Sequence, residues 1–100
     1  MTRLIDRHRK EVEALCRRRG VKSLAVFGSA ARGEVQAGSD VDLLIEFEPD
    51  AGVSLFQYQD IRDELEAIFG RPVDLASKGV LRNPYRRRTI LRDLKTIYAA

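Results

Sequence analysis

The apolar positions of the first twenty residues recur at the spacing of one helix face. Between Arg3 and Arg19 the remaining positions are mostly Arg, Lys and Glu, and Gly20 stands where a helix would end. The apolar positions are Ile5, Val12, Leu15 and Cys16. The pattern predicts one amphipathic helix with a strongly basic outer face.

A short, fully apolar run follows from Leu24 to Phe27 and stops at Gly28. Such a run is typical of a buried central strand. Residues 28–33 are small or helix-forming, and Ser29 is a residue type that caps helices. The sequence therefore predicts a strand, a tight turn and a short helix capped by Ser29, with a loop over residues 34–39.

Strict alternation begins at Asp40 and predicts a second strand as far as Phe47. One face of this strand holds Val41, Leu43, Ile45 and Phe47. The other face holds Asp40, Asp42, Leu44 and Glu46. The alternation indicates a strand with one buried face and one face that carries acidic groups.

The second half of the chain repeats the succession of helix and strand. Residues 49–52 have turn chemistry, and Ser54 with Gln57 three residues later forms a capping-box start. The buried stripe of the helix that follows is Tyr58, Ile61, Leu65, Ile68 and Phe69, and Gly70 ends it. A third strand is predicted over residues 72–76.

A last helix is predicted from Asn83, as its cap, and Pro84, at its first position. Its expected apolar face is Ile90, Leu91, Leu94, Ile97 and Tyr98. The order of elements predicts an α/β fold, in which helices pack on a small mixed sheet of about three or more strands.

One hundred residues are the size of one domain, predicted to span residues 1–100. Little chain is left for a separate lobe that would hold a substrate. Cys16 is the only cysteine, so no internal disulfide can form. No apolar run approaches the ~18 residues of a membrane span and no secretory signal opens the sequence, so we expect a cytoplasmic protein that does not enter membranes.

The net charge of +3 hides a segregation of charge along the chain. Residues 1–39 carry nine basic and four acidic side chains, residues 40–76 carry two and ten, and residues 77–100 carry seven and one. Basic flanks suggest a polyanionic partner, but the acidic centre argues against a surface that coats nucleic acid uniformly. An acidic cluster is more often a cation site or a solvated face.

The acidic centre contains a spacing that points to chemistry. Gly28 and Ser29 are followed, ten residues later, by Asp40 and Asp42. Positions i and i+2 of a strand project from one face about 6.6 Å apart, at ~3.3 Å per residue, so the two carboxylates can share Mg²⁺ ions. Asp74 on the third strand is a further candidate if the two strands are neighbours. Residues 28–33 fit neither a dinucleotide fingerprint nor a P-loop.

Three carboxylates that hold two Mg²⁺ ions suit phosphoryl or nucleotidyl transfer. A glycine lets the backbone approach a phosphate closely, and a serine hydroxyl beside it adds a donor. Arg32 lies one helical turn further and is predicted to place a cation near the leaving group. Gly28, Ser29 and Arg32 are therefore the candidate triphosphate-binding residues.

The motif from Gly28 to Gly33, followed by Ser39 to Leu43, resembles the signature of the DNA polymerase beta-like nucleotidyltransferases. The residue pattern of the motif and the length of the chain are most similar to those of the minimal nucleotidyltransferases, which pair with HEPN toxins. The resemblance spans nearly the whole chain, because residues 72–75 match the strand of the third acid and residues 83–98 look like the closing helix.

The resemblance implies that Gly28 and Ser29 bind the triphosphate, that Asp40 and Asp42 hold metal ions, and that Asp74 assists the nucleophile. It also implies adenylyl transfer from ATP to a tyrosine of a partner HEPN ribonuclease, which silences that toxin. Two other interpretations stay open: a catalytically idle module that neutralises its toxin by contact, and a nucleic-acid-binding protein.

For several other residues, a structural or solvated role is a simpler interpretation than a functional one. Glu46, Glu48 and Asp50 are expected to be solvated, His8 to be structural or superficial, and Cys16 to be a small buried residue. The run Arg86 to Arg88 stays open between contact with a partner or anion and a solvated face. It falls in the first turns of the last predicted helix, where the helix dipole disfavours cations.

Overall fold

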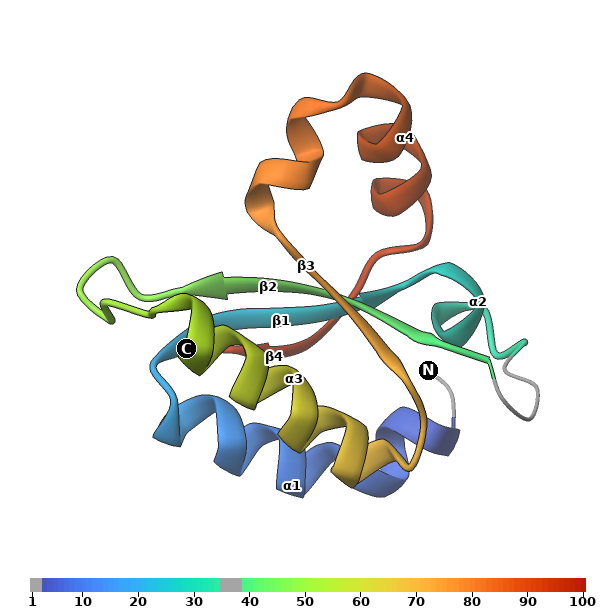
Figure 1. Cartoon of the computed structure of the whole chain (residues 1–100). Coiled ribbons are helices and arrows are strands. Elements are labelled where there is room, and N and C mark those ends of the chain that lie inside the picture. Colours follow the sequence, from blue (N-terminus) through green and yellow to red (C-terminus); the bar gives the residue numbers. More distant parts are fainter. Residues whose placement is uncertain (1–2, 35–38) are drawn as a thin grey trace.

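The computed structural model describes residues 3–34 and 39–100, which form a twisted sheet with helices on both of its faces (Figure 1). The helices are α1 (Arg3–Arg18), α2 (Gly28–Ala31), α3 (Leu55–Phe69) and α4 (Pro84–Asp93), with a 3₁₀ helix η1 (Lys78–Arg82) before α4. The strands are β1 (Val21–Phe27), β2 (Val41–Phe47), β3 (Val73–Ser77) and β4 (Lys95–Ala99). This is the α/β arrangement with a small mixed sheet that the sequence predicts.

The sheet has the strand order β3-β2-β1-β4. β1 runs antiparallel to β2 and to β4, whereas β2 and β3 are parallel and are joined by the crossover helix α3. A parallel pair requires such a crossover, and its helix must cover one face of the sheet.

α1 and α3 lie side by side on one face of the sheet and enclose the larger core (Figure 1). The apolar positions predicted for the first helix are all buried there, together with Val41, Leu43 and Ile45 of β2, whereas Phe47 is partly buried. The predicted caps of α3 are also present: Ser54 and Gln57 form a reciprocal capping box, and Gly70 is left-handed with φ +66°. These elements agree with the sequence pattern because the pattern is set by local geometry and burial.

α4 and η1 cover the opposite face, where a smaller cluster centres on Phe27, Leu44 and Ile90. Asp42 and Leu44 project from this same face of β2, because side chains alternate along a strand. This face thus carries both a small apolar core and acidic groups.

The C-terminal segment corrects the sequence prediction of one long helix to Tyr98. α4 ends at Asp93, Leu94 is extended (φ −64°, ψ 128°), and the chain continues as β4 along the free edge of β1. Leu91 is consequently 45% exposed instead of buried, while Ile97 reaches the main core. No Gly or Pro ends the helix; pairing with an otherwise open strand edge decides the change.

The predicted loop of residues 34–39 lies largely outside the described part of the chain, which omits residues 35–38. No helix among the described residues is long and apolar enough to cross a membrane.

Candidate active site

The turn at the end of β1 is built around Gly28. Its φ of +68° lies in the left-handed region that favours glycine, and it lets the chain leave the strand directly into α2. A Cβ atom at this position would collide with Oδ2 of Asp42 and lie 3.4 Å from its Cγ. Gly28 is therefore required both by the backbone conformation and by the carboxylate that lies against it.

Asp42 and Asp74 occupy paired positions in the parallel ladder of β2 and β3. Their side chains therefore leave the same face of the sheet from neighbouring strands, which lie about 4.8 Å apart. Phe27, the residue before Gly28, is the partner of Asp42 across the other ladder. The condition on which the sequence made Asp74 a candidate is met, because β2 and β3 are neighbours, and the turn at Gly28 lies beside them.

The electrostatics of Asp42 show that the acids interact. The pKa of its carboxyl is raised, first by partial burial and then by the negative charges of Asp74 and Asp40. Arg86 and Arg32 act in the opposite direction. A carboxylate held among like charges favours a bound proton or a bound cation.

The oxygen ligands around Asp42 suit a cation that brings other ligands with it. Among residues 3–34 and 39–100, no three His, Cys, Asp or Glu side chains are gathered as a ready-made metal cage. Asp42 and Asp74, with the exposed Asp40 just before β2, offer oxygen ligands from one side only. Mg²⁺ is commonly bound by one or two carboxylates, with waters and substrate phosphates completing its shell. The residues fit a Mg²⁺ ion that arrives with a nucleotide.

Ser29 is not the cap that the sequence predicts. α2 begins two residues earlier than a cap at Ser29 would place it: its first residue is Gly28, its N-cap is Phe27, and no side chain caps it. The carbonyl of Ser29 accepts a hydrogen bond of 2.9 Å from the amide of Glu34. The Ser29 side chain is therefore not needed to start the helix.

Ser29→Ala is expected to leave the free energy of unfolding within about 0.5 kcal/mol of the parent value, as at ordinary surface sites. If the Ser29 hydroxyl donates to the triphosphate, as the sequence predicts, ATP affinity should fall. Urea unfolding and ATP titration measure the two effects. Ser54→Ala is the matched control and should cost ~1 kcal/mol, because it removes a true cap. A variant at Ser29 that is as destabilised as this control and binds ATP normally would contradict the assignment.

Arg32 is held by other groups of the chain. Its guanidinium donates to Asp93 Oδ2 at 2.6 Å and to Glu34 Oε2 at 3.1 Å. Asp93 is the last residue of α4, and its side chain is 11% exposed. Arg32 thus ties α2 to the end of α4, and its predicted contact with a leaving group stays a prediction.

Arg86 is the residue near the acids that the sequence left undecided. It borders a cavity of about 210 Å³ together with Phe27, Tyr85, Thr89 and Ile90. Its positive charge lowers the pKa of Asp42 more than that of Arg32 does. Its place early in α4, where the helix dipole disfavours cations, was the only sequence feature that marked it.

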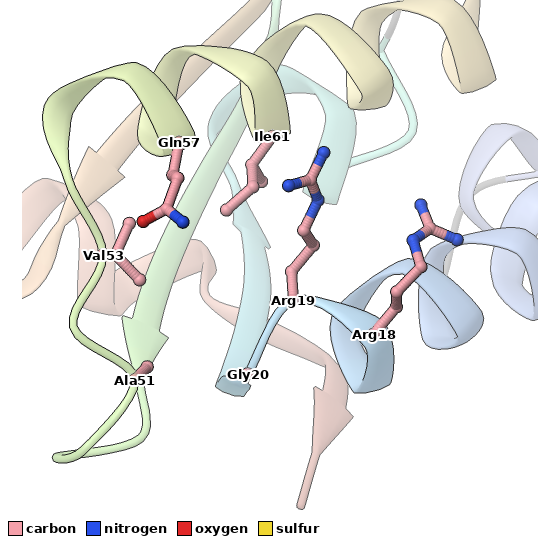
Figure 2. A pocket seen from close by; sticks show the side chains of 7 residues that line it. All are labelled: Arg18, Arg19, Gly20, Ala51, Val53, Gln57 and Ile61. Carbon is pink, nitrogen blue, oxygen red and sulfur yellow. The ribbon is translucent and has the colours of Figure 1, made fainter.

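A larger cavity of about 300 Å³ lies at the opposite end of β1, beside Gly20 (Figure 2). Figure 2 shows Arg18 and Arg19 reaching from the end of α1 toward α3. Both pair with Glu64 of α3, Arg18 at 2.5 Å and Arg19 through a closer contact. These ion pairs hold the two helices together. The residues that line this cavity include no acid, hydroxyl or thiol, and Asp42 lies at the other end of β1.

The remaining candidates have structural roles, as the sequence predicts. The ring of His8 packs edge-on against Phe69, with ring centroids 5.8 Å apart. Cys16 is buried, and this burial, with the nearby Glu13, raises the pKa of its thiol to about 12. A thiol that stays protonated is unreactive.

The fold and this arrangement of a glycine turn and strand-borne carboxylates define a nucleotidyltransferase. The nucleotidyltransferase domain family matches residues 8–97, and the chain belongs to this family. The resemblance found in the motif is thereby confirmed.

Within the nucleotidyltransferase family, the chain is similar to proteins that are named protein adenylyltransferases. A protein of Methanocaldococcus jannaschii named as a protein adenylyltransferase is 41% identical over 86 residues, 86% of each chain. The protein adenylyltransferase MntA of Thermococcus cleftensis is 37% identical over 91 residues, which are 91% of this chain and 86% of that protein.

Solved structures share the fold. A minimal nucleotidyltransferase with 37% identity has a TM-score of 0.74 and covers 90% of this chain and 89% of its own. A chain from a toxin-antitoxin structure with AMP-PNP has a TM-score of 0.71 at 17% identity, and the match covers 92% of this chain and 73% of that one.

Proposed function

We propose that this protein is an antitoxin that transfers AMP from ATP to a hydroxyl group of a HEPN-type toxin, a tyrosine in the first instance. The observation that carries the proposal is the pairing of Asp42 with Asp74 beside the turn at Gly28. Relatives named protein adenylyltransferases support the protein acceptor. The shared fold of a chain from a toxin-antitoxin structure with AMP-PNP is consistent with the nucleotide and the partner.

The reaction forms a bond between the acceptor oxygen and the α-phosphorus and breaks the bond from that phosphorus to the bridging oxygen. Pyrophosphate leaves with this electron pair, and the hydroxyl proton passes to a base. Two bound Mg²⁺ ions would neutralise charge on the phosphates and make the acceptor hydroxyl more acidic. Asp40 and Asp42 are the proposed residues that hold the ion escorting the nucleotide.

Asp74 is proposed to help bind the second ion or to accept the hydroxyl proton. It comes from a different strand than Asp42 and is exposed, so an acceptor side chain can reach it. The left-handed turn at Gly28 is proposed to bring backbone amides to the triphosphate, and Ser29 offers a hydroxyl donor. Arg86 makes no ion pair within the described residues, so its charge is available to the leaving pyrophosphate. Arg32 is already paired and is given a supporting role.

The test uses purified protein, ATP, Mg²⁺ and a HEPN-type toxin, with intact mass and pyrophosphate release as readouts. AMP should appear on the toxin only when nucleotide and metal are both present. Toxin that is neutralised without modification would instead identify an idle binding module. Tighter binding to RNA than to toxin, with steep salt dependence, would identify a nucleic-acid-binding protein.

Asp74→Asn is expected to bind ATP with Mg²⁺ about as well as the parent but to transfer ~10²–10⁴-fold more slowly, the range for loss of an acid-base group. The substitution keeps the size of the side chain and removes one of three negative charges. Without metal, the variant should be no less stable, because repulsion of Asp42 is relieved. ATP affinity, transfer rate and melting are measured on one preparation.

Two results would contradict this role for Asp74. A variant that transfers at the parent rate would remove Asp74 from the site. A variant that no longer binds ATP would show that Asp74 holds the nucleotide, so the division of labour among the acids would be wrong. Asp63→Asn, an exposed acid on α3, is the matched control and should change neither quantity.

A further inference from the structure

The arginines of α4 point to two different sides of the helix. Arg86 borders the cavity next to Phe27, on the side of the acids. Arg87 and Arg88 border another cavity, of about 300 Å³, together with Arg82 of η1. The apolar residues that line this second cavity are Leu81, Pro84 and Leu91. We call it the basic groove.

Nothing in the described part of the chain balances the charge of the basic groove. Arg82, Arg87 and Arg88 are all exposed, and among residues 3–34 and 39–100 none of them forms an ion pair. The nearby Arg92, in contrast, lies 3.4 Å from Asp93. Three unpaired cations around one cavity repel each other, and an acidic ligand would relieve this repulsion.

Local stability does not explain the arrangement either. Pro84 is the first residue of α4, so Arg87 is in the first turn and Arg88 directly follows it, where the helix dipole disfavours cations by a few tenths of a kcal/mol. Leu91 leaves 45% of its surface exposed at the same groove. A charge pattern that breaks a local rule beside an exposed apolar side chain is typical of a binding surface.

We propose that the basic groove docks an acidic segment of the acceptor protein and so presents the acceptor hydroxyl to the active site. This inference rests on the proposed function and names the surface that recognises its protein substrate. Guanidinium groups bind carboxylates in bidentate fashion, and the apolar lining accepts an apolar side chain between them. The apolar lining favours a peptide over a nucleic-acid backbone, which has no such side chain.

The position of the groove suits this role. Arg86, on the side of the acids, directly precedes Arg87, at the groove, so the two surfaces lie next to each other around α4. An acidic segment in the basic groove would therefore hold the rest of the acceptor close to Asp42 and Asp74. α4 also rises from the sheet on the face opposite α1 and α3, where a partner can approach it (Figure 1).

The test reverses two charges of the groove. R87E/R88E is compared with R7E/K10E, which makes the same charge change on the exposed side of α1. Both variants should fold, and R87E/R88E should melt no lower than the parent, because acidic residues are favoured near a helix N-terminus. The probe is a labelled peptide of alternating Glu and Leu, and its control is the same peptide with Gln in place of Glu.

The expected result is that the parent binds the Glu peptide at least tenfold more tightly than the Gln peptide. R87E/R88E should lose this preference, and R7E/K10E should retain it. With a HEPN-type acceptor, R87E/R88E should raise KM about tenfold or more and leave kcat near the parent value. Binding should also become less dependent on salt concentration in this variant alone.

Three results would overturn the inference: equal losses in the two variants, no preference of the parent for the Glu peptide, or tighter binding of an RNA oligonucleotide at the same arginines. Failure of the proposed function is distinguishable from these. A parent protein that transfers no AMP but binds the Glu peptide through Arg87 and Arg88 would refute the transfer and leave the basic groove established.

Discussion

Asp42→Asn is expected to lower the rate of AMP transfer by about 100-fold or more, on the scale of losing one group that stabilises charge in the transition state. Asparagine keeps the shape of the side chain but removes the negative charge that would compensate a metal ion. The same variant should lose the stabilisation that Mg²⁺ with ATP gives the parent protein. A pyrophosphate assay and melting curves with and without Mg²⁺ measure both effects.

The metal-free Asp42→Asn protein should also be more stable than the parent near pH 7. Partial burial and the charges of Asp74 and Asp40 raise the pKa of Asp42 above its ordinary value of 3.8, so the folded state binds a proton more tightly than the unfolded state. The parent therefore loses stability as the pH rises through the raised pKa. The advantage of the variant should shrink on acidification and disappear below the ordinary value.

Asp60→Asn, an exposed acid on α3, serves as the control for these effects. It should transfer AMP at the parent rate and show no such gain in stability. If Asp42→Asn transferred at the parent rate, the metal assignment would be wrong. If its metal-free stability stayed below that of the parent across the pH range, Asp42 would be contributing a favourable contact rather than repulsion.

Gly28→Ala is expected to lower both stability and activity more than the same substitution at Gly52, another glycine with positive φ. An alanine at φ +68° is strained by ~1–2 kcal/mol, and its Cβ would also collide with the carboxylate of Asp42. Overpacking of this kind adds about 1–3 kcal/mol. Because the collision moves a proposed metal ligand, transfer should be nearly abolished. Urea unfolding and the transfer assay give the two values.

Two variants separate the collision from the strain. Gly52→Ala has a similar φ of +60° and no atom within 4 Å of the added Cβ, so it should show the strain alone and retain activity. The double variant G28A/D42A removes the carboxylate and should recover the overpacking part of the lost stability, but not the activity. Equal destabilisation by Gly28→Ala and Gly52→Ala would show that Asp42 does not lie against the turn.

The sequence by itself determined the elements whose form depends on neighbouring residues. The capping box of Ser54 and Gln57, the glycine at the end of α3 and the alternation of β2 are local features, and each predicted its element. The motif that contains Gly28, Asp40 and Asp42 likewise predicted the family, through its resemblance to the nucleotidyltransferase signature. These features need no knowledge of distant contacts.

Tertiary structure decided what depends on pairing between distant segments. Residues 95–99 carry apolar side chains at helical spacing, yet they form β4, because the hydrogen bonds offered by the edge of β1 outweigh a weak helix preference. Only the ladder of β2 and β3 places Asp74 beside Asp42. Ser29 lost its predicted role as a cap because Phe27 stays extended and α2 starts directly at the strand end.

For the arginines of α4 too, the sequence and the tertiary structure determined different properties. Their run in the sequence marks an unusual concentration of charge, but it does not tell which face each side chain takes. That depends on how α4 packs on Phe27 and Leu44 through Ile90, which turns Arg86 to the acids and Arg87 and Arg88 to the basic groove. Local pattern thus determined which residues carry charge, whereas packing across the sheet decided where each charge acts, since only packing fixes the rotation of a helix about its axis.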